Sequence, residues 1–189
     1  DIRFKDLNSD DVLDEQDRTK IGDPWPDFVY GLSLGATWKG FDFNVFFQGS
    51  QGNDVLNMTL RDFESGTGTM NAREGFLNRA WNGEGSTDKY HRISAEQGQN
   101  SEISDYFVED GSYLRLKNLQ LGYNFCERLL KIKGISYLRL YVSAQNLFTL
   151  TKYSGLDPEI GSSNATLNGI DQGFYPQART WTVGLNIKF

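Results

Sequence analysis

The chain of 189 residues is poor in the residues that build metal and catalytic centres, with one cysteine, Cys126, and one histidine, His91. A single cysteine excludes an intrachain disulfide and a thiolate metal cluster, and a single histidine is too few for a histidine-based zinc site or triad. We expect Cys126 to be a small apolar side chain near a strand end. His91 is expected to be an exposed loop residue, and no catalytic residue is predicted.

Long hydrophobic runs and an excess of basic residues are also missing. Apolar runs such as 28–30 reach only three residues, so the sequence predicts neither a transmembrane helix nor a signal peptide. Acidic residues number 25 against 19 basic ones, a net charge of −6, which argues against nucleic acid as a partner. The chain starts at Asp1 without an initiator methionine, which favours a segment of a longer protein.

Aromatic residues are plentiful, at 14% of the chain, and five segments alternate apolar with polar or small side chains. A period of two is typical of a strand with one apolar face, so we expect strands at 28–38, 41–48, 113–125, 137–147 and 181–189. Lys39-Gly40 predicts a tight turn. In the third segment the apolar positions change from even to odd near Lys117-Asn118, which predicts a β-bulge. The last segment places these side chains on one face: Trp181, Val183, Leu185, Ile187 and Phe189.

The connections alternate in length, being short at 39–40, moderate at 126–136, and long at 51–110 and 149–176. This asymmetry is typical of outer-membrane β-barrels, whose long loops lie outside the cell. We therefore predict an all-β fold, an antiparallel transmembrane β-barrel segment. Its parts would be an extracellular loop at 1–26, a hairpin at 27–50, a long extracellular loop at 51–110, a hairpin at 111–148, an extracellular loop at 149–176 and a closing strand at 177–189.

Five strands cannot close such a barrel, so we expect them to pair with strands outside this sequence. Two alternatives remain open at this stage. One is a passive or structural outer-membrane barrel, and the other is a soluble β-sandwich module that binds glycans through calcium.

Several motifs, in a fixed order, resemble the C-terminal part of SusC/RagA-type TonB-dependent transporters. They lie at 1–10, 22–28, 46–49, 52–54, 108–119, 143–148, 155–161 and 175–179. The resemblance implies a barrel of about 22 strands that is filled by a plug, covered by a SusD-like surface lipoprotein and coupled to the TonB complex. Neither the plug nor the TonB box is in this sequence.

The same resemblance implies import of oligosaccharides or peptides through the outer membrane of a Gram-negative bacterium, with lipid around the barrel and no enzymatic activity. It also marks the apolar residues of the last strand, ending at Phe189, as the signal that the barrel-assembly machinery reads.

The acidic segment 6–17 spaces its oxygen-bearing side chains like a calcium loop of the EF-hand or dockerin type. The candidate ligands are Asp6, Asn8, Asp10, Asp14 and Asp17. Two positions depart from that pattern, because Asp11 stands where a glycine is usual and Asp17 replaces the longer glutamate. The alternative is a solvated acidic loop that is capped by Asx-turns.

Two loop features are candidates for contact with a ligand or a partner. Trp81 and Glu84 lie beside flexible, hydrogen-bonding residues, an arrangement that suits stacking on a sugar ring, although Trp81 also suits a loop anchor. In the next long connection, Tyr153, Asp157 and Glu159 are candidates for contact with the lipoprotein lid. We do not expect Asp157 and Glu159 to be a catalytic pair, because a flexible loop cannot hold two carboxylates rigidly.

Overall fold

The computed structural model describes residues 1–64, 70–94, 98–125, 134–161 and 165–189. The chain divides into two compact units. Unit 1 consists of Asp1–Trp25, Asn53–Asp110 and Tyr153–Phe174, and unit 2 of Pro26–Gly52, Gly111–Lys152 and Tyr175–Phe189. Cys126 and most of the predicted connection at 126–136 lie outside the described residues.

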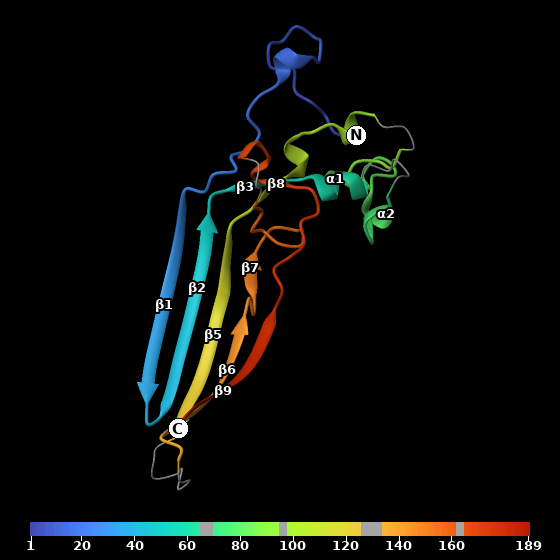
Figure 1. The fold of residues 1–189 in the computed structure, drawn as a ribbon. Helices are drawn as coiled ribbons and strands as arrows, with labels where there is room; N and C mark the ends of the chain where they lie inside the picture. The colour runs from blue at the N-terminus through green and yellow to red at the C-terminus, as the bar shows by residue number, and fades with distance from the viewer. Residues whose placement is uncertain (65–69, 95–97, 126–133, 162–164) are drawn as a thin grey trace. The chain divides into compact units, whose positions relative to one another are not determined.

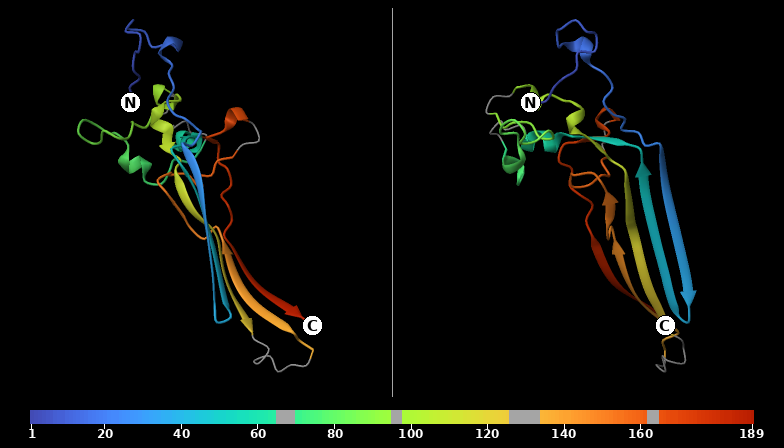
Figure 2. Two further views of the ribbon diagram at one scale, coloured as in Figure 1. Left: turned by 90° about the vertical axis from the view of Figure 1, so that its left-hand side faces the viewer. Right: turned by 180° about the vertical axis from the view of Figure 1, so that it is seen from behind.

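Unit 2 is an antiparallel sheet (Figures 1 and 2). Its main strands, in spatial order, are β1 (Phe28–Trp38), β2 (Phe41–Gln51), β5 (Tyr113–Phe125), β6 (Tyr137–Gln145) and β9 (Thr180–Lys188). A short strand, β7 (Thr149–Thr151), also pairs with β5. The predicted all-β, antiparallel fold is confirmed, although the second strand runs further than expected and the fourth is interrupted after Gln145.

The register of unit 2 follows from the alternation of its side chains. Each strand places apolar residues opposite apolar residues of its neighbour, as in the pairs Leu34↔Val45, Leu121↔Val142 and Leu140↔Leu185. One face of the sheet is therefore apolar and the other polar or small. The strand directions place the β1–β2 turn and the end of β9 at one end of the sheet, and the long connections leave from the opposite end (Figures 1 and 2).

The predicted β-bulge in β5 is confirmed. Asn118 pairs with Phe46 and Leu116 with Phe47, so Lys117 is the extra residue. The extra residue explains how the apolar positions change parity and still share one face. The interruption between β6 and β7 lies opposite, where Asn146 has a φ of 51° and donates its backbone N–H to the Lys117 carbonyl at 3.1 Å.

Unit 1 is formed by most of the segments that we predicted to be extracellular loops, and the structure shows short helices and strands within them. Their extracellular position stays a prediction. It holds a sheet in which β3 (Asp54–Asn57) lies between antiparallel β4 (Val108–Asp110) and parallel β8 (Ile170–Asp171). It also holds the helices α1 (Met58–Glu64) and α2 (Phe76–Arg79) and four single 3₁₀ turns, at Glu15–Asp17, Gln99–Ser101, Asp105–Phe107 and Ala165–Leu167. None of the described helices has the length and apolar character needed to cross a membrane.

The elements of unit 1 are held by a small core of buried apolar side chains, Val55, Phe76, Phe107 and Tyr153. Each element is too short for its apolar residues to repeat at a recognisable period, which is why the alternation pattern missed them. The segments thus fold on one another, and they bring together side chains that are far apart in the sequence.

Candidate functional site

The apolar face of unit 2 is exposed over all five main strands. Its members include Leu32, Leu34, Phe43, Leu121, Leu140, Val142, Val183 and Leu185, with exposures from 37% for Phe43 to 72% for Val183. A water-soluble protein covers an apolar surface of this extent, whereas lipid is a suitable solvent for it. The exposure of these side chains argues against the soluble β-sandwich alternative, in which they would form the core of the molecule.

The candidate assembly-signal residues of the last strand lie on this same face. Trp181, Val183, Leu185 and Ile187 pair with Ala144, Val142, Leu140 and Leu138 of β6. Phe189 follows the end of β9 and is 88% exposed. The predicted alternation of β9 is therefore present, and recognition of these residues by an assembly machinery stays a prediction.

The polar face of unit 2 carries an ion pair near the β1–β2 turn. Arg139 of β6 donates from Nε to Oδ2 of Asp42 at 2.9 Å and from Nη2 to Oδ1 at 2.5 Å. The pair crosses β5 at Gly122, where an added Cβ would lie 2.5 Å from the Asp42 carboxylate and 2.7 Å from the Arg139 guanidinium. Only glycine leaves room for this crossing. Asn124 of β5 also donates to Asp42 Oδ2, at 3.1 Å.

The acidic segment at 6–17 is held by hydrogen bonds from its own backbone to its side chains. Asp6 accepts from the N–H groups of Ser9 and Asp11 at 2.6 and 2.8 Å, and Asp17 accepts from those of Leu7 and Asp14 at 2.7 and 3.0 Å. The backbone donors of Asp14 and Leu7 hold the pKa of Asp17 below its usual range.

The other candidate calcium ligands take part in the same kind of contact. Asn8 accepts from Asp10 N–H, Asp10 from Val12 N–H and Asp14 from Gln16 N–H. These are the contacts of the Asx-turn alternative. Among the described residues, no three histidine, cysteine, aspartate or glutamate side chains form a group that could hold a metal ion. Calcium binding by this segment stays a prediction.

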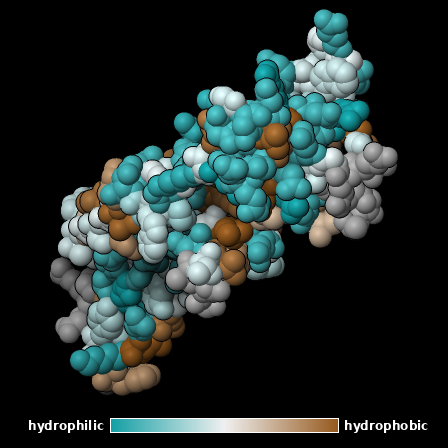
Figure 3. Space-filling view, turned by 90° about the horizontal axis from the view of Figure 1, so that it is seen from above, coloured by the Kyte–Doolittle hydropathy of each residue, from teal (hydrophilic) through white to brown (hydrophobic). Residues whose placement is uncertain are grey.

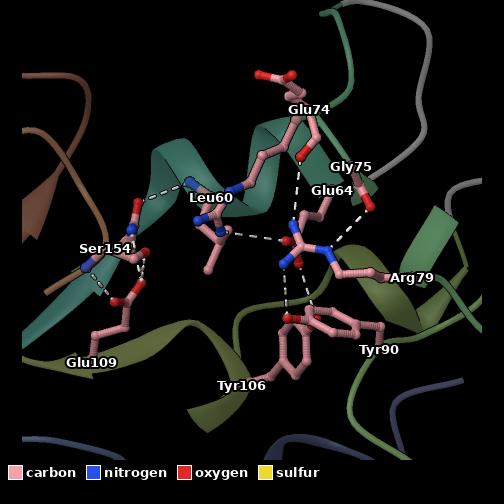
Figure 4. A network of polar contacts seen from close by, with 11 residues as sticks. Leu60, Glu64, Glu74, Gly75, Arg79, Tyr90, Tyr106, Glu109 and Ser154 are labelled. Carbon is pink, nitrogen blue, oxygen red and sulfur yellow. Dashed lines mark hydrogen bonds and ion pairs between the residues drawn. The ribbon is translucent and has the colours of Figure 1, made fainter. Parts of the chain in front are cut away.

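A network of polar side chains lies around α1 and α2 in unit 1 (Figure 4). The buried carboxylate of Glu64 accepts a hydrogen bond from the Tyr106 hydroxyl at 2.9 Å, and Arg73 Nη1 lies 3.8 Å from its Oε1. Burial, followed by the charge of Glu64, raises the pKa of Tyr106, so this hydroxyl remains a donor. Arg79 donates to the carbonyls of Gly75 and Glu74 in the same network.

A second part of the network joins the segment that precedes β5 to the segment that follows β7. The Glu109 carboxylate accepts from the Ser154 hydroxyl at 2.7 Å, from the Ser154 N–H at 2.8 Å and from the Asn57 amide at 2.9 Å (Figure 4). Ser154 and Glu109 are 45 residues apart in the sequence. Unit 1 is thus tied together by buried or partly buried carboxylates.

The structure places the three predicted contact residues of the 149–176 connection in different surroundings. Tyr153 is buried and donates its hydroxyl to Asp171 Oδ2 at 2.5 Å, and burial together with this contact raises the pKa of Tyr153. Asp157 is also buried and accepts from the Glu159 N–H at 2.9 Å. Tyr153 and Asp157 therefore support the segment internally, and contact of all three residues with a ligand or partner stays a prediction.

Trp81 lies at a cleft of about 610 Å³ within unit 1. His91, Tyr90 and Tyr106 also line this cleft, whereas the other predicted contact residue of this loop, Glu84, is exposed and is not among its lining residues. The expectation that His91 is exposed was wrong. His91 is only 5% exposed, and its ring packs between Phe76 and Tyr106, with centroid distances of 5.4 and 5.6 Å.

Hydrophilic residues cover most of the surface that is seen from above in Figure 3, and hydrophobic residues form separate patches there.

Sequence reasoning missed the burial of His91 and Glu64, because nothing in the neighbouring residues distinguishes a buried polar side chain from an exposed one. Only the flanking aromatics, Tyr90 beside His91 and Phe63 beside Glu64, hint at an apolar environment.

Comparisons with known proteins identify the family. No protein-family model matches the chain. TonB-dependent receptor P3 of Formosa agariphila is 42% identical over 192 residues, which cover 98% of this chain and 19% of that receptor. TonB-dependent receptor SusC of Bacteroides thetaiotaomicron is 34% identical over 195 residues, which cover 98% of this chain and 17% of that receptor. The solved RagAB peptide importer in its open-open state superposes with a TM-score of 0.73 at 31% identity, over 87% of this chain and 17% of that one. The chain belongs to the SusC/RagA family of TonB-dependent receptors.

The predicted resemblance is thereby confirmed. This member of the SusC/RagA family spans less than a fifth of the length of each of these three relatives. The relatives named above are described as receptors or as an importer, and none as an enzyme.

Proposed function

We propose that the chain forms five neighbouring strands and the external connections of a TonB-dependent importer in the outer membrane of a Gram-negative bacterium. The observation that carries this proposal is the exposed apolar face that continues over β1, β2, β5, β6 and β9. The main strands, of 9 to 13 residues, are long enough to cross a bilayer when strands are tilted by about 45°. Membership of the SusC/RagA family supports the same assignment.

The side of the membrane follows from the connections. The two-residue β1–β2 turn and the end of β9 lie at one end of the sheet, and the long segments leave from the other. Outer-membrane barrels place short turns in the periplasm and long loops outside the cell. We therefore assign unit 1, which contains these long segments, to the extracellular side.

For substrate and partners we propose oligosaccharides or peptides, delivered with the help of a SusD-like surface lipoprotein. Support comes from the likeness to SusC and to the RagAB peptide importer. The importer would also need a plug, the remaining strands of the barrel and the TonB complex, which supplies energy through a part of the receptor that is outside this chain.

The test is uptake of fluorescently labelled oligosaccharides and peptides by cells that express the complete receptor, with and without TonB. We expect uptake only when TonB is present and the inner membrane is energised. Equal uptake without TonB would overturn the importer proposal and support the passive-barrel alternative. A control receptor with a known TonB-dependent ligand verifies that the strain is energised.

A further inference from the structure

Two asparagines of unit 1 are followed directly by glycine, in the pairs Asn82-Gly83 and Asn168-Gly169. Asparagine is a thermolabile residue, because the backbone nitrogen of the next residue can attack its side-chain amide carbon. The attack is easiest before glycine, which has no Cβ to shield the nitrogen and whose backbone rotates most freely. The two pairs are alike in sequence, but their surroundings in the structure differ.

The Asn82-Gly83 pair lies in a turn that closes on itself. Asn82 is exposed, and the Ser86 hydroxyl accepts from its backbone N–H at 3.1 Å and donates to the Gly83 carbonyl at 2.7 Å. Gly83 has a φ of 147°, and a Cβ added to it would meet no atom of a more distant residue within 4 Å. The groups that would react, the Asn82 side-chain amide and the Gly83 N–H, have no hydrogen-bond partner among the described residues. The attack therefore breaks no contact between this turn and the rest of unit 1.

The Asn168-Gly169 pair is held by packing and by a backbone hydrogen bond. Gly169 is buried, and its carbonyl accepts from the Leu56 N–H of β3 at 2.8 Å. A Cβ added to Gly169 would lie 2.5 Å from Pro24 Cβ, so the backbone is closely enclosed. The next residue, Ile170, begins β8 and pairs with Leu56. Rotation of this backbone towards the geometry of attack breaks these contacts, so the reaction requires local opening of the β3–β8 pair.

We propose that Asn82 is a site of spontaneous deamidation in the folded receptor and that the fold protects Asn168. The Gly83 nitrogen loses its proton to the solvent and bonds to Asn82 Cγ, and the side-chain amide leaves as ammonia, which closes a succinimide ring. Water then opens this ring. Opening at Cγ gives aspartate, whereas opening at the backbone carbonyl gives isoaspartate, whose main chain runs through the former side chain. The net reaction consumes one water molecule and releases one ammonia.

The modification changes the turn that follows Trp81. Either product adds a negative charge two residues before Glu84, and isoaspartate also lengthens the main chain directly after Trp81. The Trp81 N–H donates to the His91 carbonyl at 3.3 Å, so we expect the added length to displace the exposed turn and not the buried His91. The inference goes beyond the proposed import function and does not depend on it, because the reaction needs only water and the local conformation.

The experiment incubates the complete receptor in detergent at mildly alkaline pH and follows both asparagines by peptide mass spectrometry. Digestion in acidic heavy-oxygen water identifies conversion that occurs during digestion, because only that conversion incorporates the heavy isotope. We expect Asn82 to form aspartate and isoaspartate at least about tenfold faster than Asn168, since opening of the β3–β8 pair costs a hydrogen bond and the packing of Gly169. In receptor unfolded by guanidinium, the two sites should convert at rates within about twofold of each other, because both precede glycine.

The matched variants are Gly83→Ala and Gly85→Ala. Both glycines have a positive φ, 147° and 79°, and a Cβ added to either would meet no atom of a more distant residue within 4 Å, but only Gly83 supplies the attacking nitrogen. Gly83→Ala should slow the conversion of Asn82 severalfold, whereas Gly85→Ala should leave it within about twofold of the unmodified receptor. The proposal is overturned if Asn82 stays intact in the folded receptor, if Asn82 and Asn168 convert there at the same rate, or if the two variants convert equally. These failures are distinct from TonB-independent uptake, which would refute the importer proposal alone.

Discussion

Replacing Val183 by arginine tests whether the apolar face of β9 contacts lipid. The strand contains nine residues, so Gly184 is its centre and Val183 lies one residue away. With a rise of about 3.3 Å per residue and a tilt near 45°, this displacement is roughly 2 Å of membrane depth. An arginine at mid-membrane on the lipid face of a barrel costs about 2–4 kcal/mol. We expect Val183→Arg to lower the free energy of unfolding by that amount, and Leu185→Arg to match it.

The control is Thr182→Arg, which adds the same side chain to the adjacent residue on the polar face, where Thr182 pairs with Ser143. It should cost less than about 1 kcal/mol, because the guanidinium remains in water. Trp181→Arg should fall in between, since three residues from the centre correspond to roughly 7 Å of depth. The assay is guanidinium unfolding of the complete receptor in lipid vesicles, with free energies compared at equal m-values. Equal costs at Val183 and Thr182 would refute the assignment of lipid to this face.

Three further predictions follow from the sites described above. Arg139→Met leaves the mostly buried Asp42 without its cation and should lower the free energy of unfolding by about 2–4 kcal/mol; adding Asp42→Asn should recover part of this loss, and no recovery would contradict the pairing. The folded-state pKa of Asp17 lies below its unfolded-state pKa of about 4. Its contacts therefore stabilise the segment fully above about pH 4 and are lost as the pH falls through the folded-state pKa. The Leu7 amide NMR shift should accordingly be constant from pH 7 to about 5 and move below about 4; Ca²⁺ should leave it unchanged, whereas a saturable shift would establish the calcium alternative. Deleting Phe189 should reduce the amount of receptor in the outer membrane several-fold with little change in the unfolding of what is inserted, and normal membrane levels would count against its role in assembly.

The main strands of unit 2 were predictable because their side chains alternate between an apolar face that suits lipid and a polar face that suits water. The period-two pattern therefore identifies both the strand and the face of the sheet on which each side chain lies. In β5 the apolar positions change from even to odd residue numbers, and in a regular strand only an extra residue explains this change. The pattern was less informative where β6 ends. Asn146 has a left-handed φ of 51°, and the apolar Leu147 and Phe148 behind it concealed the interruption.

Unit 1 was not predictable because its structure depends on contacts between distant residues. The Tyr106 hydroxyl and Glu64 are 42 residues apart, and Asn57 and Glu109 are 52 apart. Elements of two to seven residues bury only a few apolar side chains each, so no local period identifies them. The same reason explains the error at His91, whose burial comes from Phe76 and Tyr106 and not from its neighbours in sequence.

The two outer strands of unit 2 connect the fold to the proposed function. β1 and β9 are the terminal strands of the described sheet, with 11 and 9 residues. β1 contains neither a charged residue nor a proline, and β9 has only Lys188, at its last position. Soluble proteins protect long edge strands with charges, prolines or bulges, because unpaired backbone groups beside apolar side chains otherwise pair with other chains. In a membrane the requirement is stricter, since lipid cannot hydrogen-bond to an open edge. Both edges must therefore pair with further strands, and the relatives, of which this chain spans less than a fifth, are long enough to provide them.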